Sequence, residues 1–184
     1  MDTSDFKDLD EVFGDEPARQ RRERSQIEFP YTDAGQAMAL AQTLYAEGGG
    51  SAEREQLAAW MDQSVSGGTF RSRVSAAMMF GFILSERGHV QITDLGRNVA
   101  DESRRPAALA EAFLHVPLFK AMFERYKGYA LPPAAAIERQ MVELGVPLRQ
   151  KERARQTFQR SAEVCGYIDG TSGRFVRPAT HERP

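Results

Sequence analysis

Apolar residues recur three and four positions apart along most of the chain, the spacing at which side chains share one face of a helix. The first such stretch begins after Thr32 or Asp33, either of which can cap a helix, and it stops at three glycines, residues 48–50. Its expected core face consists of Ala37, Leu40, Ala41, Leu44 and Tyr45. These signals predict a first helix.

Two more helices are predicted downstream. Ser51 can cap the second helix, and Ser-Gly-Gly at residues 66–68 breaks the chain before Thr69, which can cap the third over residues 69–82. The second helix is expected to bury Leu57, Trp60 and Met61. On the third, one face holds Phe70, Val74, Ala77 and Gly81.

The next segment has the pattern of a β-hairpin followed by a fourth helix. Residues 82–84 and 89–92 have the composition of short strands, and residues 86–88 fit the turn between them. Thr93 can cap a following helix that carries Leu95. The first half is therefore expected to run as three helices, a hairpin and a helix.

That order resembles the winged helix-turn-helix class. Residues 92–97, Ile-Thr-Asp-Leu-Gly-Arg, are similar to the hydrophobic-Thr-x-x-Gly-Arg segment that often follows a wing strand in this class. Residues 28–170 also resemble a family of uncharacterised bacterial and archaeal proteins with a winged-helix start, a central segment like Val116-Pro117-Leu118-Phe119 and a C-terminal helix with a Gly-aromatic ending. The resemblance implies a fold without an established activity.

Helical patterns continue in the second half. Two helices around Pro117 have strongly apolar faces, and they should pack the two halves together: Leu109, Phe113, Leu114, Phe119, Met122, Phe123 and Tyr126. Two prolines, residues 132–133, open another helix, which Gly145 can end. A long helix is expected over residues 149–165, before Gly-Tyr-Ile.

An internal repeat links the two halves. Shifted by 85 residues without a gap, residues 53–90 align with 138–175, and AMMFGFI at 77–83 meets AEVCGYI at 162–168. The repeat predicts a second wing that turns at residues 170–174. The expected fold is mainly α with small β-hairpin wings, as two winged-helix-like units in tandem packed through central helices.

The expected organisation has four parts. Residues 1–28 form a disordered tail, acidic and then basic, and residues 29–105 the first winged-helix unit. Residues 106–178 form the central helices and the second winged-helix-like unit, and residues 179–184 a disordered C-terminus.

Composition and charge narrow the function. The 184 residues are 41% hydrophobic, and a net charge of -2 offers no overall attraction to DNA or anionic membrane. Residues 106–184, however, carry twelve basic and eight acidic side chains. The single cysteine, Cys165, excludes an intramolecular disulfide, and we expect it to be buried and inert. An acidic start and the absence of a run of about 18 apolar residues predict a cytoplasmic protein without a membrane span.

The helix over residues 149–165 carries the main candidate site. Opposite its core face lie basic and amide side chains that can reach phosphates and base edges: Arg149 just before the first turn, then Arg153, Gln156 and Arg160, with Lys151 at the flank of the core side. A second contact is expected from Arg71, Arg73 and Ser75 on the third helix, and a weaker one from Arg87 in the wing. The alternative is a solvated helix face, but such faces usually mix charge signs, and here only Glu152 and Glu163 oppose the stripe.

We therefore expect a non-enzymatic protein that binds double-stranded DNA, as a transcriptional regulator or chromosome-associated factor in the nucleoid, and as a homodimer if one unit serves assembly. The alternative is a protein-interaction module. Its partner would bind an exposed Met79 or the apolar positions of the tail, Phe6, Leu9, Val12 and Phe13, which lie near helical spacing.

Catalysis finds little support in the sequence. The three histidines, His89, His115 and His181, are far apart and have no metal-ligand spacing, and no glycine-rich phosphate loop occurs. We expect no enzyme activity, no cofactor and no metal.

Overall fold

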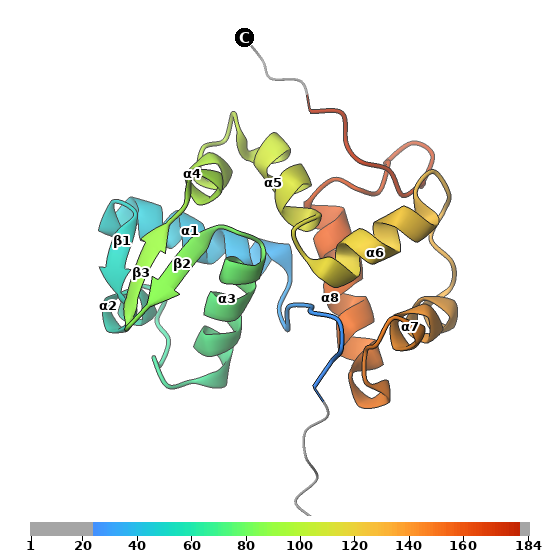
Figure 1. The fold of residues 1–184 in the computed structure, drawn as a ribbon. Coiled ribbons are helices and arrows are strands. Elements are labelled where there is room, and N and C mark those ends of the chain that lie inside the picture. The colour runs from blue at the N-terminus through green and yellow to red at the C-terminus, as the bar shows by residue number, and fades with distance from the viewer. Residues whose placement is uncertain (1–23, 181–184) are drawn as a thin grey trace, which may run out of the picture.

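The structure is a computed structural model, and it describes residues 24–180. Within that range the chain is mainly helical, with eight α-helices and one small antiparallel sheet of three strands. Figure 1 shows the sheet and α1 to α4 on one side, and α5 to α8 on the other. The segment before α1 crosses between α3 and α8.

Helix α1, Ala34–Gly48, begins where the sequence predicts. Of the two cap candidates, Asp33 serves: its side chain accepts a hydrogen bond of 3.1 Å from the Gln36 amide. The expected core face is buried except for Tyr45, which is 48% exposed. Tyr45 instead lies beside Arg97, whose guanidinium carbon is 6.0 Å from the centre of the Tyr45 ring.

The segment after α1 corrects the prediction of a Ser51 cap. Residues Ser51–Glu53 form strand β1, and α2, Arg54–Trp60, is capped by Glu53, which exchanges hydrogen bonds with Gln56. Residues Ser51–Glu53 form a strand and not a helix start because their backbone pairs with β3, His89–Ile92, nearly forty residues away. A local capping signal does not reveal this pairing. Trp60 is 39% exposed rather than a core residue.

Helix α3, Gly68–Met79, starts earlier than expected, with Gly67 and not Thr69 at the cap. Gly81 does not share a helical face with Phe70: it follows the helix at φ +86°, a conformation that favours glycine. On either side of it Phe80 and Phe82 are fully buried, with ring centres 5.8 Å apart. The helix therefore turns sharply into the next strand.

The predicted hairpin is present. Strands β2, Ile83–Glu86, and β3, His89–Ile92, pair antiparallel, and β1 joins the other edge of β3. Arg87 and Gly88 form the two-residue turn at φ +50° and +86°, the positive values that a hairpin turn of type I′ requires.

The Thr-x-x-Gly-Arg segment has a structural role. Thr93 caps α4, Asp94–Ala100, as predicted: its hydroxyl accepts a hydrogen bond of 3.0 Å from the Gly96 amide and donates one of 2.5 Å to the Gly81 carbonyl. A Cβ on Gly96 would collide with the Phe82 carbonyl oxygen. Only glycine lets α4 pack this closely on the start of the hairpin.

Four helices and a short 3₁₀ turn make up the second half: α5, Arg105–Phe113; α6, Pro117–Tyr126; α7, Ala134–Glu143; η1, Leu148–Gln150; and α8, Lys151–Val164. Helix α8 packs on α7, where Arg155 donates a 2.8 Å hydrogen bond to Glu138. It also packs on α1, where the Ala34 amide donates to the buried Ser161 hydroxyl at 3.0 Å.

An aromatic cluster holds α5, α6, α8 and the C-terminal segment together. Phe113 lies at its centre, with Tyr167 stacked 4.2 Å from it, ring centre to ring centre. The other members are Phe119, Phe123, Phe158 and Phe175, and Phe80 reaches Phe119 from the first half. The Tyr167 hydroxyl donates a 2.5 Å hydrogen bond to the Ala110 carbonyl.

The chain after α8 pairs less than the first hairpin. Two isolated antiparallel bridges form, one between Ile168 and Phe175 and one between Ala130 and Arg174. Residues 167–176 therefore make hairpin-like contacts without building regular strands.

Candidate nucleic-acid interface

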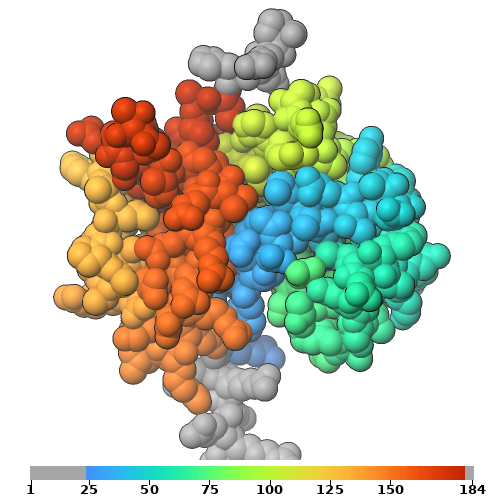
Figure 2. Space-filling view, turned by 180° about the vertical axis from the view of Figure 1, so that it is seen from behind, coloured from blue at the N-terminus to red at the C-terminus, as the bar shows by residue number. Residues whose placement is uncertain are grey.

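A basic hollow lies between the N-terminal part of α3 and the exposed side of α8. Its volume is about 600 Å³, and its walls include Arg73 from α3, Arg153 and Arg160 from α8, and Tyr31 and Asp33 from the segment before α1. We call this site the arginine hollow. In Figure 2 the blue start of the described chain lies between the orange α8 and the green α3.

The charges of the arginine hollow are largely uncompensated. Among residues 24–180, Arg73, Arg153 and Arg160 form no ion pair. Asp33 is the one acid among the lining residues, and its carboxylate already accepts the Gln36 amide as the cap of α1. Three guanidinium groups around one hollow favour an anionic ligand, since a guanidinium fork matches the oxygens of a phosphate or a carboxylate.

Tyr31 positions one of these arginines. The Arg153 guanidinium carbon lies 5.2 Å from the centre of the Tyr31 ring, and the Tyr31 hydroxyl donates a 3.4 Å hydrogen bond to Gln150. The ring of Phe29 is tilted against Tyr31 at 5.5 Å. This stacking restricts the rotamers of Arg153 without neutralising its charge.

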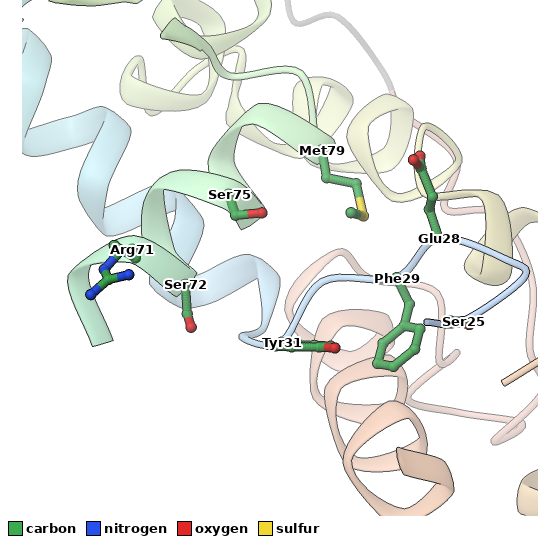
Figure 3. Close-up of a pocket in the computed structure, with 8 residues that line it drawn as sticks. All are labelled: Ser25, Glu28, Phe29, Tyr31, Arg71, Ser72, Ser75 and Met79. Carbon is green, nitrogen blue, oxygen red and sulfur yellow. The ribbon is translucent and has the colours of Figure 1, made fainter. Parts of the chain in front are cut away.

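A second, smaller pocket adjoins the arginine hollow, and Tyr31 and Ser72 line both. Its volume is about 310 Å³, and its apolar wall is formed by Phe29 and Met79. Figure 3 shows Met79 extending from α3 toward the segment before α1, whereas the ring of Phe29 lies on the side of that segment that faces away from α3. The charged groups that line this apolar pocket are Arg71 and Glu28, so it carries no net charge.

The predicted stripe on α8 is only partly brought together. Arg153 and Arg160 line the arginine hollow, whereas Arg149 lies in η1, before the α-helix begins. The Gln156 amide donates a 3.2 Å hydrogen bond to Glu152 on its own helix. Lys151 belongs elsewhere: its ammonium lies 3.5 Å from the Glu138 carboxylate of α7, because the flank of α8 is packed on that helix.

The residues predicted on α3 divide between the two pockets. Arg73 enters the arginine hollow, while Arg71 and Ser75 line the apolar pocket. Met79 was expected to be exposed, but it is half-buried against the core because it faces the apolar pocket. Its neighbour Met78 is the exposed methionine, at 44%.

Two other predicted contacts lie outside both pockets. Arg87 projects from the hairpin turn, 92% exposed and 4.0 Å from the Glu86 carboxylate. The apolar positions of the N-terminal tail, Phe6, Leu9, Val12 and Phe13, fall outside the described residues.

Sequence reasoning missed Tyr31 and Asp33 as site residues. The one local signal at Tyr31 is an aromatic residue two positions before the cap of a helix, and the structure shows its side chain to be 49% exposed. The long-range packing of α1 on both α3 and α8 places it between them.

The sequence analysis also missed a row of hydrogen-bonded side chains on the sheet, formed by Ser51, His89 and Glu53. The Ser51 hydroxyl lies 2.9 Å from His89 Nε2, and His89 Nδ1 lies 3.0 Å from a Glu53 carboxylate oxygen. The order matches a serine hydrolase triad, but the side chains of His89 and Glu53 are 47% and 58% exposed. Catalysis of that kind needs a site that excludes water and donors for an oxyanion. We interpret these hydrogen bonds as a polar contact between the neighbouring strands β1 and β3.

Cys165 is buried as predicted, with 3% of its surface exposed. Burial, and to a lesser degree the charge of Asp33, raises the pKa of its thiol to about 12. The thiolate is therefore scarce at neutral pH, which makes the side chain a poor nucleophile.

Over residues 24–180, histidine, cysteine and acidic side chains do not gather in threes as a metal site would require. In the same range, every helix is too short or too polar to cross a bilayer.

Comparisons of the chain with known proteins find no matching protein family, no matching curated protein and no matching solved structure.

Proposed function

We propose that the chain binds double-stranded DNA and holds the sugar-phosphate backbone in the arginine hollow. The observation that carries this proposal is the convergence of Arg73, Arg153 and Arg160, from helices eighty residues apart, on one hollow without a competing ion pair. Phosphate contacts of this kind supply most of the affinity of non-specific DNA binding. The chain would lie in the cytoplasm, on the nucleoid.

The proposal includes a second winged-helix-like unit in residues 106–178. Its support is a shared local geometry at the ends of α3 and α8. Gly81 and Gly166 follow the two helices at φ +86° and +77°. In each case the next aromatic amide donates a 2.8 Å hydrogen bond to an alanine carbonyl five residues back. The backbone therefore has the same local geometry at two positions that the 85-residue shift aligns, which supports the proposal.

The pairing after α8 agrees with the same proposal. The bridge between Ile168 and Phe175 follows α8 as the pairing of β2 with β3 follows α3, but its partners differ from those of the 85-residue shift, which aligns them with Ile83 and Val90. The bridge between Ala130 and Arg174 involves a residue before α7, as the pairing of β1 with β3 involves residues before α2. Helices α3 and α8 then hold equivalent places, each directly before the hairpin-like segment of its half. In helix-turn-helix proteins, the helix that enters the major groove carries the contacts to DNA.

The side chains around the arginine hollow favour DNA binding that depends only weakly on the DNA sequence. Gln156, the side chain best suited to read a base, is already hydrogen-bonded to Glu152. The arginines of the hollow are suited to phosphates, which carry no sequence information directly. We therefore favour a chromosome-associated factor over a regulator of one site. The homodimer expected from the sequence stays a prediction.

A salt titration of binding to a labelled duplex tests the proposal. The full chain should lose affinity steeply as salt rises, and Arg153→Ala/Arg160→Ala should give a log–log slope shallower by roughly 1.8, because each phosphate contact contributes about 0.9. The matched control is Arg125→Ala/Arg139→Ala, which removes the same charge from exposed positions on α6 and α7 outside the hollow. Absence of duplex binding at about 50 mM salt, or equal slopes for the two variants, would refute the proposal.

The apolar pocket favours one other function, a protein-interaction module. Met79 and the half-exposed Tyr31 offer an apolar surface beside the three arginines, and Phe29, which is 5% exposed, lines the same pocket. Such a surface suits a peptide better than a duplex. This alternative would gain support if the salt titration found no duplex binding.

A further inference from the structure

The two adjoining pockets together define a ligand that is acidic on one part and apolar on another. The arginine hollow presents Arg73, Arg153 and Arg160, and the apolar pocket presents Phe29 and Met79. The two share a wall at Tyr31 and Ser72, so one short ligand can occupy both. A DNA backbone satisfies the first pocket but leaves the second without an apolar partner. An acidic peptide with apolar side chains satisfies both.

The N-terminal segment of the same chain has this composition. Residues 1–16 contain seven acidic side chains and a single basic one, Lys7. Interspersed among the acids are four apolar positions: Phe6, Leu9, Val12 and Phe13. Carboxylates pair with guanidinium forks as phosphates do, so this segment can compete for the same arginines.

The segment is also attached at the right place. The described chain begins at Arg24, and Ser25 lines the apolar pocket. Ten residues separate Phe13 from Arg24. An extended chain of that length spans at most roughly 35 Å, at about 3.3–3.6 Å per residue. Attachment through a short linker raises the local concentration of the segment to about the millimolar range, so contacts with a Kd of about 0.1 mM would keep it bound nine-tenths of the time.

We propose that residues 5–16 bind in the arginine hollow and the apolar pocket of their own chain, with the acidic side chains on Arg73, Arg153 and Arg160 and the apolar ones against Phe29 and Met79. The binding of this segment stands on the two pockets alone. Its consequence, competition with DNA, rests on the proposed function. A segment bound nine-tenths of the time would weaken DNA binding about tenfold.

A spin label tests the docking directly. In the full chain, Ser4→Cys introduces a thiol that can be labelled selectively, because Cys165 is buried and its pKa is raised to about 12. A nitroxide at position 4 should broaden the Met79 methyl signal in the NMR spectrum and spare that of Met141, which is buried in α7 away from both pockets. Leu9→Ser/Phe13→Ser should restore the Met79 signal.

The matched control is Ala18→Ser/Gln20→Ser, which alters the linker outside the segment and should leave the broadening intact. An unaffected Met79 signal, or broadening that survives Leu9→Ser/Phe13→Ser, would overturn the proposal. Broadening that appears when labelled chain is mixed with unlabelled, methyl-observed chain would assign the contact to a second copy and overturn it as well.

Duplex binding gives the second measurement. Leu9→Ser/Phe13→Ser should raise the affinity for DNA about tenfold, with Ala18→Ser/Gln20→Ser unchanged. If the Met79 methyl signal is broadened but no duplex binds to any variant, the docking of the segment is supported and the DNA proposal alone fails. If duplex binds but Met79 is unaffected, the DNA proposal stands and the docking is refuted.

Discussion

Truncation of Phe113 to alanine should reveal how tightly the two halves of the molecule are joined. The side chain is fully buried at the end of α5, and four aromatic rings surround it with centres 4.2 to 6.1 Å away: Phe119, Phe158, Tyr167 and Phe175. Phe→Ala changes in cores usually cost about 3–5 kcal/mol, and rigid rings leave little room for collapse around the cavity. We expect a loss near the upper end of that range.

A loss of this size is a large fraction of the total stability of a domain, about 5–15 kcal/mol. For a chain of this length it corresponds to a fall in Tm of roughly 6–20 °C, at about 2–4 °C per kcal/mol. The arginine hollow takes residues from both halves, so its shape depends on the same packing. The relative position of α3 and α8 is therefore sensitive to this cluster.

Urea unfolding followed by two probes gives the test. Trp60, the only tryptophan, reports on the first half by fluorescence, and far-UV circular dichroism reports on all helices. Both probes should show one transition, shifted equally by Phe113→Ala. Tyr129→Ala is the control: this side chain is 73% exposed, and its removal should change the free energy of unfolding by no more than about 0.5 kcal/mol. A loss below about 1 kcal/mol, or a fluorescence transition that Phe113→Ala leaves unmoved, would refute the reasoning.

Two further predictions concern polar contacts. A hydrogen bond from Arg155, aided by the charge of Lys151, holds the pKa of Glu138 below its ordinary value of 4.5. The folded state then binds fewer protons than the unfolded state, so the stabilisation is complete above that value and is lost as the pH falls through the lower, folded pKa. Urea unfolding at stepped acidic pH should show a weaker dependence for Glu138→Gln, and an identical profile would contradict the assignment. Ser51 should resist a fluorophosphonate probe, because the neighbouring His89 and Glu53 side chains are about half exposed to water. Ser51→Ala should cost no more than about 1 kcal/mol, and specific labelling of Ser51 would show that the polar contact is a catalytic one.

The local signals of the sequence predict the ends of several elements correctly. Asp33 and Thr93 cap α1 and α4 because a short polar side chain next to a helix can reach a free amide without help from the rest of the fold. The turn at Arg87 and Gly88 follows from its own residues in the same way. These interactions span three or four positions, so the sequence contains all their parts.

The predictions from sequence are wrong where a residue far away in the chain determines the local structure or contact. Ser51 is a plausible cap, but β3 pairs with its backbone and draws it into a strand. Lys151 was predicted to contact DNA from the flank of the helix, but its ammonium lies 3.5 Å from the Glu138 carboxylate of α7. Met79 is half-buried because the segment before α1 lies opposite it. In each case the competing contact comes from a segment that periodicity alone does not place.

The sequence by itself determines the mainly helical class, the hairpin and the basic character of the two helices, because these depend on the spacing of apolar and charged residues along one element. The arginine hollow was decided by tertiary structure. Arg73 and Arg153 are eighty residues apart, and they share one hollow because the two halves pack through a common aromatic core and α1 contacts both helices. Burial of that core is non-directional, so no local pattern states in advance which two exposed faces it will bring together.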